Sequence, residues 1–364
     1  MLDKYANLLV NYSLSIKEGD RLCIRTTTLA EPLVREIYRS ATKAGAHVEV
    51  IMDFDEKSEI FMAEGNEEQM KWVSPLTKLA FEEFEAYLVI RAPYESKPVK
   101  AGLPNASTLI AQAHESIQTI YSKRTASREL KRSLCQYPTE SAAKTAGMSL
   151  EEYTSFIFHA CKLDQEDPIK AWLKVRDDQQ AIVDCLNKSS TIQYLGPNID
   201  LTFSTKGRLW INSDGQTNMP SGEVYTSPVE DSVNGFVYYT FPSIYGGREV
   251  KGIRLEVKDG LITNWEAESG KDYLDNVFQI PGARRFGEAA IGTNYEIDRM
   301  TRNILFDEKI GGTVHLAIGQ SYLQTGGLNQ SSIHWDMITD MKNGGKIMAD
   351  GKMIYENGLF LLNQ

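Results

Sequence analysis

The hydrophobic pattern of this chain changes near Lys188, and this change constrains the fold more than any other feature. Beyond it, the run GIRLEVKDGLITNWEAE alternates apolar and polar residues on both sides of Asp259-Gly260, a pattern typical of a β-hairpin. The run KIMADGKMIYENGLF repeats the pattern at Asp350-Gly351 and Asn357-Gly358. We therefore predict a mainly antiparallel β (α+β) domain in the C-terminal half.

The first hundred residues show a different pattern, in which helical and extended periodicities alternate. A helix is predicted from Leu2 to about Leu14, and a second helix in LAEPLVREIYRSATKAG, where Val34, Ile37, Tyr38 and Ala41 recur at the spacing of one helix face. Short apolar runs predict strands at Arg21–Arg25, His47–Met52 and Ala86–Ile90. This alternation predicts an α/β domain with a largely parallel sheet.

The segment from about Ala106 to Asn187 has a helical pattern, interrupted at Pro138 and Pro168. A chain of 364 residues exceeds the usual size of one hydrophobic core, so we expect two domains. We predict an N-terminal α/β domain with this helical segment over residues 1–188, and a second domain over 189–364.

Composition excludes several classes of function. A net charge of −10 has the wrong sign for a protein that follows phosphate backbones, so no nucleic-acid partner is expected. No stretch is long and apolar enough for a membrane helix, and charges interrupt the N-terminal segment where a signal peptide would be apolar, so a cytoplasmic protein is expected. The four cysteines lie far apart without a C-x-x-C pair and are expected to be buried free thiols: Cys23, Cys135, Cys161 and Cys185.

Two histidines lie among glycine-flanked apolar residues near the C-terminus. In SSIHWDMI, His334 and Asp336 are two residues apart, so in a strand both side chains project from one face and can reach one ion. They can equally be an edge-strand pair that is solvated. His315 in GGTVHLAIG is either a ligand or a core histidine that hydrogen-bonds a backbone carbonyl.

Three further residues stand in unusual local sequence. Glu223 in NMPSGEVYTSP and Glu288 in GARRFGEAAIGTN lie among small residues, although a surface or capping role is the ordinary one for a single glutamate. Tyr322 is, by itself, a half-buried tyrosine. No G-x-S-x-G elbow, P-loop or H-E-x-x-H helix occurs, so a serine hydrolase and the common zincin arrangement are unsupported.

Taken together, these segments resemble the thermophilic aminopeptidase (M29) family of metallopeptidases, whose members include aminopeptidases T and S. At the N-terminus the resemblance rests on LDKYANLLVNYSL, KEGDRLCIR and TLAEPLVREIYRSATKAGAHVEV, and in the middle on YPTESAAKTAGMSLEEY and QEDPIKAW. The specific segments are C-terminal: NMPSGEVYTSP, GARRFGEAAIGTN, DEKIGGTVHLAIG, SYLQTGGLNQ and SSIHWDMI.

The resemblance implies a C-terminal metal-binding catalytic domain. Carried over residue by residue, it implies metal ligands at Glu223, Glu288, His315, His334 and Asp336, with Tyr322 lining the same site. Glu308 in the DEKIGG segment stays open as a further member of the site.

The implied cofactor is a pair of divalent metal ions, either zinc, cobalt or manganese, because a mixed nitrogen and oxygen ligand set argues against calcium. We expect Glu288 to bridge the ions, Glu223 or Glu288 to accept the proton of an attacking water, and Tyr322 to donate to the oxyanion.

The expected function is a metal-dependent aminopeptidase acting on peptides with a free N-terminus, and the resemblance also implies a homodimer. Two alternatives remain: a dinuclear hydrolase of a non-peptide amide, and a non-catalytic metal-binding protein on the same scaffold.

Overall fold

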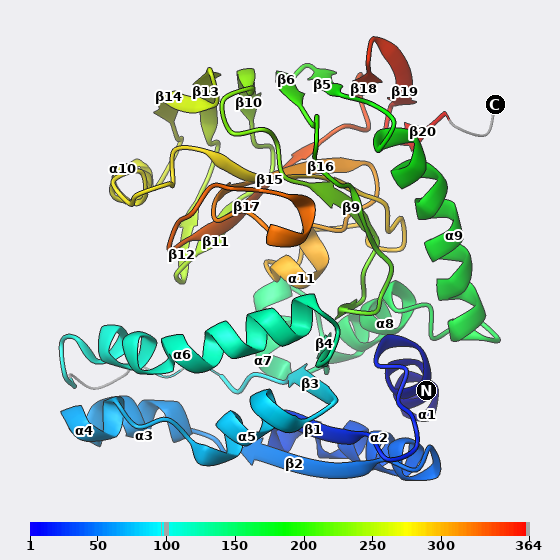
Figure 1. Cartoon of the computed structure of the whole chain (residues 1–364), viewed down its shortest axis with the longest axis vertical. Helices are drawn as coiled ribbons and strands as arrows, with labels where there is room; N and C mark the ends of the chain where they lie inside the picture. The colour runs from blue at the N-terminus through cyan, green and yellow to red at the C-terminus, as the bar shows by residue number, and fades with distance from the viewer. Residues whose placement is uncertain (96, 98–101, 362–364) are drawn as a thin grey trace. The chain divides into compact units, whose positions relative to one another are not determined.

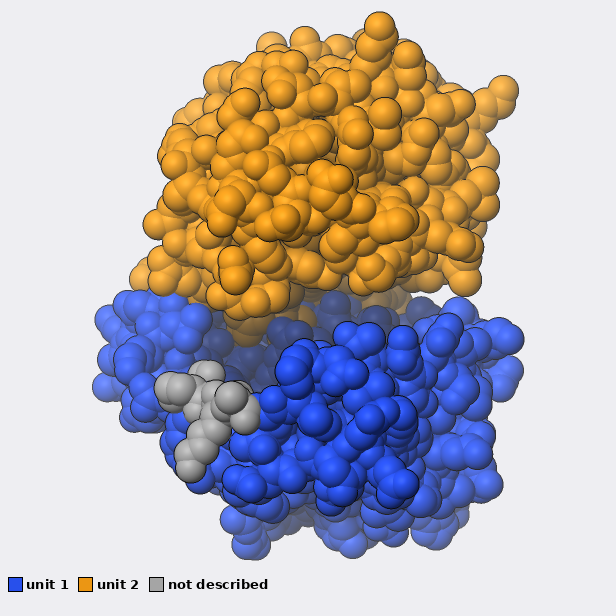
Figure 2. Space-filling model, turned by 90° about the vertical axis from the view of Figure 1, so that its left-hand side faces the viewer, with its two compact units in different colours: residues 1–169, 215–220 blue, residues 170–214, 221–364 orange. Residues whose placement is uncertain are grey.

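The computed structural model describes residues 1–95, 97 and 102–361, which form two compact units (Figures 1 and 2). Unit 1 comprises residues 1–169 and 215–220, and unit 2 comprises residues 170–214 and 221–364. The units divide near the start of helix α9 (Pro168–Leu186), whereas the predicted boundary lies just after its end. Helix α9 packs with the β-rich unit 2. The boundary between the units therefore lies one helix before the change from helical to strand patterns in the sequence.

Unit 1 contains a parallel sheet with the strand order β2-β1-β3-β4-β8 in the described chain, which confirms the predicted α/β architecture. Its strands are β1 (Arg21–Thr27), β2 (His47–Asp53), β3 (Ala86–Arg91), β4 (Lys131–Gln136) and β8 (Asn218–Met219). The accompanying helices are α1 (Leu2–Leu8, continued by a π-helical turn at Leu9–Ser13), α2 (Glu31–Lys43), α3 (Lys57–Glu64), α4 (Glu67–Met70), α5 (Pro75–Glu83), α6 (Ala106–Ala126), α7 (Glu140–Ala146) and α8 (Leu150–Ala160).

Strand β4 corrects the prediction that the segment from about Ala106 to Asn187 is helical apart from interruptions at Pro138 and Pro168. Its sequence, KRSLCQ, carries little apolar signal, yet β4 lies between β3 and β8 and pairs with both. The hydrogen bonds of these two neighbours, together with the burial of Ser133 and Cys135, hold the segment as a strand despite its composition.

Helix α2 confirms the predicted second helix but shifts its buried face. Val34, Ile37 and Ala41 are buried as expected, whereas Tyr38 is 50% exposed and Leu33 takes its place in the core. A tyrosine at the edge of an apolar stripe can keep its hydroxyl hydrogen-bonded to water, whereas a leucine has no polar group and is more stable when buried.

Unit 2 is built from antiparallel sheets, which confirms the second half of the predicted fold class. In the described chain one sheet has the order β14-β13-β10-β6-β5-β18-β19-β20, a second has the order β17-β16-β15-β9-β7, and β11 pairs with β12. The strands are β5 (Thr191–Gly196), β6 (Ile199–Ser204), β7 (Ile211–Ser213), β9 (Glu223–Thr226), β10 (Asn234–Tyr238), β11 (Ser243–Tyr245), β12 (Arg248–Val250), β13 (Arg254–Lys258), β14 (Leu261–Glu266), β15 (Phe286–Gly292), β16 (Thr313–Gly319), β17 (His334–Asp340), β18 (Lys346–Ala349), β19 (Lys352–Glu356) and β20 (Leu359–Phe360), and the short helices are α10 (Lys271–Val277) and α11 (Ile304–Asp307).

The three predicted hairpin turns of unit 2 are confirmed. Asp259, Asp350 and Asn357 have φ of 49°, 47° and 52°, and each is followed by a glycine that also has positive φ. Two consecutive residues with positive φ match the right-handed twist of the flanking strands, which is why Asp-Gly and Asn-Gly are favoured there.

The core of unit 2 is formed by apolar residues from both large sheets. Leu201 and Phe203 of β6 belong to the same buried cluster as Val314, Leu316 and Ile318 of β16. Because alternate residues of a strand point to opposite faces, the other face of β16 carries His315, Ala317 and Gly319. None of the helices found in the described residues has the length and apolarity needed to cross a membrane.

Candidate metal centre

The five predicted ligands lie on one face of the sheet β17-β16-β15-β9, and the strand register explains why. Glu288 of β15 is paired with Ala317 of β16, and Ala317 is paired with Asp336 of β17. Residues directly opposite each other in adjacent strands share a face, as do residues two apart in one strand. His315 and His334 therefore join this face two residues from Ala317 and Asp336.

Glu223 of β9 lies on the same face. It is paired with Gly292 of β15, and Gly292 shares a face with Glu288 because the two are four residues apart in that strand. Two glycines on this face allow other backbone segments to approach closely. A Cβ atom at Gly292 would lie 2.2 Å from the carbonyl oxygen of Ile310, and one at Gly319 would lie 2.2 Å from that of Ile333. Glycine at these positions brings the segments around Ile310 and Ile333 against the site.

The first half of the centre contains Glu223, Glu288 and His315, all of which are buried. The Nε2 atom of His315 lies 3.4 Å from Oε2 of Glu223 and 3.7 Å from Oε1 of Glu288. For a core histidine we expected a backbone carbonyl beside the imidazole. Instead, two carboxylates face Nε2 of His315.

The second half contains Glu288, His334 and Asp336. The Nε2 atom of His334 lies 3.1 Å from Oε2 of Glu288 and 3.4 Å from Oδ1 of Asp336. Its Nδ1 atom lies 2.8 Å from the carbonyl oxygen of Gln320, to which Nδ1–H donates. This contact leaves the Nε2 lone pair of a neutral imidazole directed at the carboxylates, the usual arrangement of a metal-bound histidine.

The donor set fits divalent cations. Within each half, one ligand atom from each residue lies within 4.8 Å of the others. Oε2 of Glu223 and Oδ1 of Asp336 are buried and have no hydrogen-bond partner in the part of the chain that the structure describes. Buried anionic oxygens without donors are costly, and a cation satisfies them. Imidazole nitrogens beside carboxylate oxygens suit zinc, cobalt or manganese.

Electrostatics keep two carboxylates of the centre, Asp336 and Glu288, ionised. Burial raises the pKa of Asp336, but the neighbouring His334 more than offsets it and brings that pKa to about 2. Burial likewise raises the pKa of Glu288, and its contacts with His315 and His334 lower it below the ordinary value. Within the protein alone, the same carboxylates outweigh burial and raise the pKa of His315 to about 9. The centre therefore attracts positive charge.

Tyr322 lies beside the second half of the centre. Its hydroxyl oxygen is 3.3 Å from Nε2 of His334, and its ring packs edge-on against Tyr225 at 5.4 Å between centroids. Burial and the nearby carboxylate of Glu288 raise the pKa of Tyr322 well above its ordinary value. The phenol thus stays protonated and can donate a hydrogen bond into the site.

Glu308 and Lys309 lie at the edge of the first half. Lys309 Nζ is 3.4 Å from Oε1 of Glu223 and also forms an ion pair with Glu308. Glu308, whose membership was left open, contacts Lys309 and belongs to neither group of three ligands. Lys309 was missed by the sequence reasoning, although a lysine directly before the apolar, glycine-rich run IGGTVHLAIG was a usable signal.

Comparisons with known proteins agree with this geometry. The family model described as thermophilic metalloprotease (M29) matches residues 1–360. Aminopeptidase 2 of Geobacillus stearothermophilus is 30% identical, over 96% of this chain and 95% of that protein. Aminopeptidase T of Thermus thermophilus is 26% identical, over 98% of this chain and 95% of that protein. The chain belongs to the M29 family.

The structure of this M29 protein resembles that of wild-type AmpT from Thermus thermophilus, with a TM-score of 0.83 and 23% identity over 99% of this chain and 98% of that one. It also resembles 2,5-dihydroxypyridine dioxygenase from Pseudomonas putida, with a TM-score of 0.59 and 14% identity over 99% of this chain and 96% of that one. At these identities the likeness shows the fold alone. The predicted family, fold class and metallopeptidase class are confirmed.

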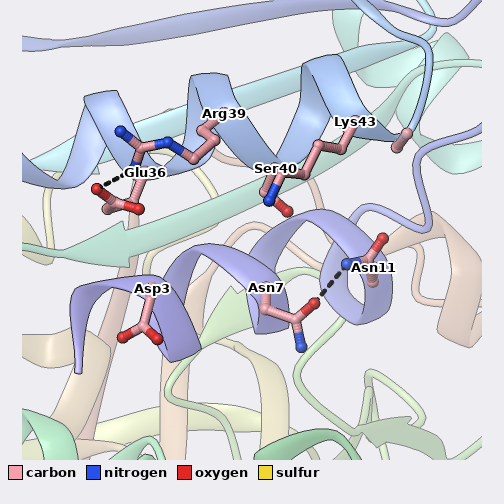
Figure 3. A pocket seen from close by; sticks show the side chains of 8 residues that line it. Asp3, Asn7, Asn11, Glu36, Arg39, Ser40 and Lys43 are labelled. Atoms are coloured by element: carbon pink, nitrogen blue, oxygen red, sulfur yellow. Dashed lines mark hydrogen bonds and ion pairs between the residues drawn. The ribbon is translucent and has the colours of Figure 1, made fainter.

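Two hollows among the described residues of this M29 protein contain none of the five predicted ligands. A polar pocket of about 330 Å³ lies between α1 and α2 of unit 1 (Figure 3). Its polar groups pair among themselves: Asn11 Nδ2 donates to Oδ1 of Asn7, 2.6 Å away, and Arg39 forms an ion pair with Glu36. A second hollow of about 650 Å³ in unit 2 is lined by the segment after β16, including Gln320, Leu323 and Leu328.

The remaining histidines belong to unit 1 and lie in structural or exposed positions. His47 begins β2 and is exposed. Nδ1 of His114 lies 2.8 Å from the carbonyl oxygen of Ile110 within α6, and Nδ1 of His159 lies 2.8 Å from Oδ2 of Asp164. The predicted free thiols are also present, with Cys23, Cys135 and Cys161 buried and Cys185 partly buried.

Proposed function

We propose that this M29 metalloprotease is a dinuclear aminopeptidase whose two divalent ions are bridged by Glu288. The observation that carries the proposal is the division of the Glu288 carboxylate between two imidazoles, since Oε1 faces His315 and Oε2 faces His334. One ion would be held by Glu223, Glu288 and His315, and the other by Glu288, His334 and Asp336. Zinc, cobalt and manganese are the ions that this ligand set favours.

Divalent ions in such a site make a water molecule a strong nucleophile near neutral pH and polarise the carbonyl under attack. Side chains of the protein would then handle the proton of the water and stabilise the oxyanion. Glu223 or Glu288 accepts the proton of the attacking water, since both are buried carboxylates of the centre. Tyr322 would donate a hydrogen bond from its hydroxyl to the oxyanion, because its high pKa keeps it protonated and it lies beside His334.

The substrates are peptides with a free N-terminus. The centre gathers three carboxylates from neighbouring strands, with Glu308 nearby, so its surroundings are strongly acidic. A positively charged α-ammonium group is favoured there, either as an ion pair or, after losing its proton, as a ligand. The relatives named aminopeptidases support this substrate class.

Chelation tests the proposal directly. Removal of divalent ions should abolish release of the N-terminal residue from a peptide, and zinc, cobalt or manganese should restore it, with metal analysis giving two ions per chain. Full activity in protein verified to be metal-free would contradict the proposal.

Two substrate types separate the alternative functions. Aminoacyl-anilides should be hydrolysed and the corresponding N-acylated amides should not. Preference for the acylated amides would favour a hydrolase of non-peptide amides, and metal binding without turnover of either would favour a non-catalytic protein.

We further propose that the protein acts as a cytoplasmic homodimer without nucleic-acid partners. The negative net charge of −10 supports the absence of nucleic acid, and the family resemblance supports the dimer. Light scattering at micromolar concentration should give twice the mass of one chain, and a monomer would count against this assembly.

A further inference from the structure

Lys309 is a buried charged residue of unit 2 that the proposed chemistry does not use. Its side chain is 0% exposed, although lysine is almost never fully buried without a partner. An ammonium group removed from water is costly unless nearby anions compensate it. Burial of Lys309 therefore does not by itself stabilise the core, and its position calls for a specific explanation.

Two carboxylates surround this ammonium group. Nζ of Lys309 lies 3.4 Å from Oε1 of Glu223, and it forms a closer ion pair with Oε1 of Glu308. Glu308 is the less enclosed partner, with 15% of its side chain exposed. One cation thus links a carboxylate at the rim of the site with a carboxylate of the metal-binding face.

The backbone that carries Lys309 is fixed to the backbone that carries Glu223. Asn294 donates its N–H to the carbonyl oxygen of Lys309 at 3.0 Å, and its Nδ2 donates to the carbonyl oxygen of Ser221 at 2.8 Å. Thr293 N–H donates to the carbonyl oxygen of Gly222 at 2.9 Å. The distance between the ammonium group and Glu223 is therefore set by bonds along both segments.

The two oxygens of Glu223 face different partners. Oε1 faces Lys309, whereas Oε2 faces His315 at 3.4 Å and has no hydrogen-bond partner within residues 1–95, 97 and 102–361. A carboxylate held at one oxygen cannot rotate freely, so its other oxygen keeps one direction. Groups that orient a ligand in this way tune metal affinity even though they never touch the metal.

We propose that Lys309 is a positioning residue that holds Oε1 of Glu223, so that Oε2 is presented to a divalent ion beside His315, with Glu308 neutralising the lysine. This assignment rests on the proposed metal centre. When Glu308 is ionised its charge cancels that of Lys309, so the pair can orient Glu223 without strongly changing the attraction of the centre for cations.

A purely structural role for the pair predicts a different result from a positioning role. Lys309→Met alone would leave two buried carboxylates without their cation and should lower the melting temperature of metal-free protein. Lys309→Met combined with Glu308→Gln removes both charges and leaves the net charge of the protein unchanged. If the pair were only structural, this double variant would recover both stability and metal affinity.

The test measures zinc affinity by competition with a chromophoric chelator and, separately, the melting temperature of the metal-free full-length protein. The double variant should melt close to wild type yet bind zinc about 10- to 100-fold more weakly, the usual loss when a supporting contact of a ligand is removed. Glu308→Gln keeps the contact between Lys309 and Glu223 and should lose less. The matched control is Lys131→Met with Asp20→Asn, which removes an enclosed pair of unit 1.

A double variant that binds zinc within about threefold of wild type would overturn the assignment, as would a Glu308→Gln variant that loses as much affinity as the double variant. Wild-type protein that binds no zinc would instead overturn the proposed metal centre itself, and this assignment with it. Because zinc affinity and melting temperature are read without substrate, the result does not depend on the identity of the peptide.

Discussion

Unit 2 buries carboxylates in two contrasting environments. Oδ1 of Asp307 accepts hydrogen bonds from Thr301 N at 2.7 Å and Thr301 Oγ1 at 2.8 Å. Oδ1 of Asp336 and Oε2 of Glu223 are buried without a hydrogen-bond donor among the described residues. The first carboxylate is satisfied by its own loop, and the other two are arranged around shared imidazoles.

This difference separates a structural carboxylate from a binding one. Burial raises the pKa of Asp307 to about 6 and outweighs its hydrogen bonds, whereas His334 brings the pKa of Asp336 to about 2. A buried acid that stays ionised and lacks donors is prepared for a cation. The comparison can be tested one residue at a time.

The largest effect is expected for Glu288→Gln, which removes the carboxylate shared by both halves of the centre. Gln keeps the size of the side chain but supplies one neutral oxygen, so both ions should bind weakly. Turnover should fall by about a thousandfold or more. Metal analysis and peptide hydrolysis, measured on the same sample, check this prediction. Normal occupancy of two ions would show that the Glu288 carboxylate is not a ligand shared by both halves.

His334→Ala should affect one half of the centre more than the other. It removes the nitrogen that faces Glu288 and Asp336, while Glu223, Glu288 and His315 keep their arrangement. Metal content should fall toward one ion per chain, and turnover should nearly disappear. The control is His114→Ala in unit 1, and two ions bound with wild-type affinity by His334→Ala would show that His334 is no ligand.

Tyr322→Phe should separate catalysis from metal binding. The ring still packs against Tyr225, but the hydroxyl beside His334 is gone. Metal content should stay near normal while turnover falls by roughly two to three orders of magnitude, the usual loss for one oxyanion donor. Near wild-type turnover with metal bound would make Tyr322 a packing residue.

The smallest effect on turnover is expected for Asp307→Asn. Its oxygen can still accept from Thr301, so zinc affinity and turnover should stay within about twofold of wild type. A loss of metal affinity here would show that buried carboxylates of both environments serve the centre.

The same variant gives a pH test of the comparison. The pKa of Asp307 rises from 3.8 to about 6 on folding, so the folded protein binds the extra proton between these values. The free energy of unfolding contributed by this group therefore falls as the pH rises through that window. In denaturant titrations, the free energy of unfolding of wild type minus that of Asp307→Asn should fall between pH 4 and 6. A rise of this difference over the same range would contradict the prediction.

Much of the architecture could be predicted from local sequence. The Asp-Gly and Asn-Gly turns identified the hairpins of unit 2, and the alternation of helix and strand patterns identified the parallel sheet of unit 1. Strand β4 could not be predicted in this way, because its polar residues are held by pairing with β3 and with β8, a segment some eighty positions later in the chain. Long-range pairing of this kind leaves no local periodicity.

For the candidate site, the sequence by itself determined which residue types are available and that His334 and Asp336 share one face, since strand alternation is a local property. The family resemblance then selected the remaining ligands. Only the tertiary structure decided that Glu223, Glu288 and His315 meet on that face, because their approach depends on the register of strands far apart in the chain. It also decided the place of Lys309, because a lysine becomes a buried partner of Glu223 only after separate segments pack and exclude water.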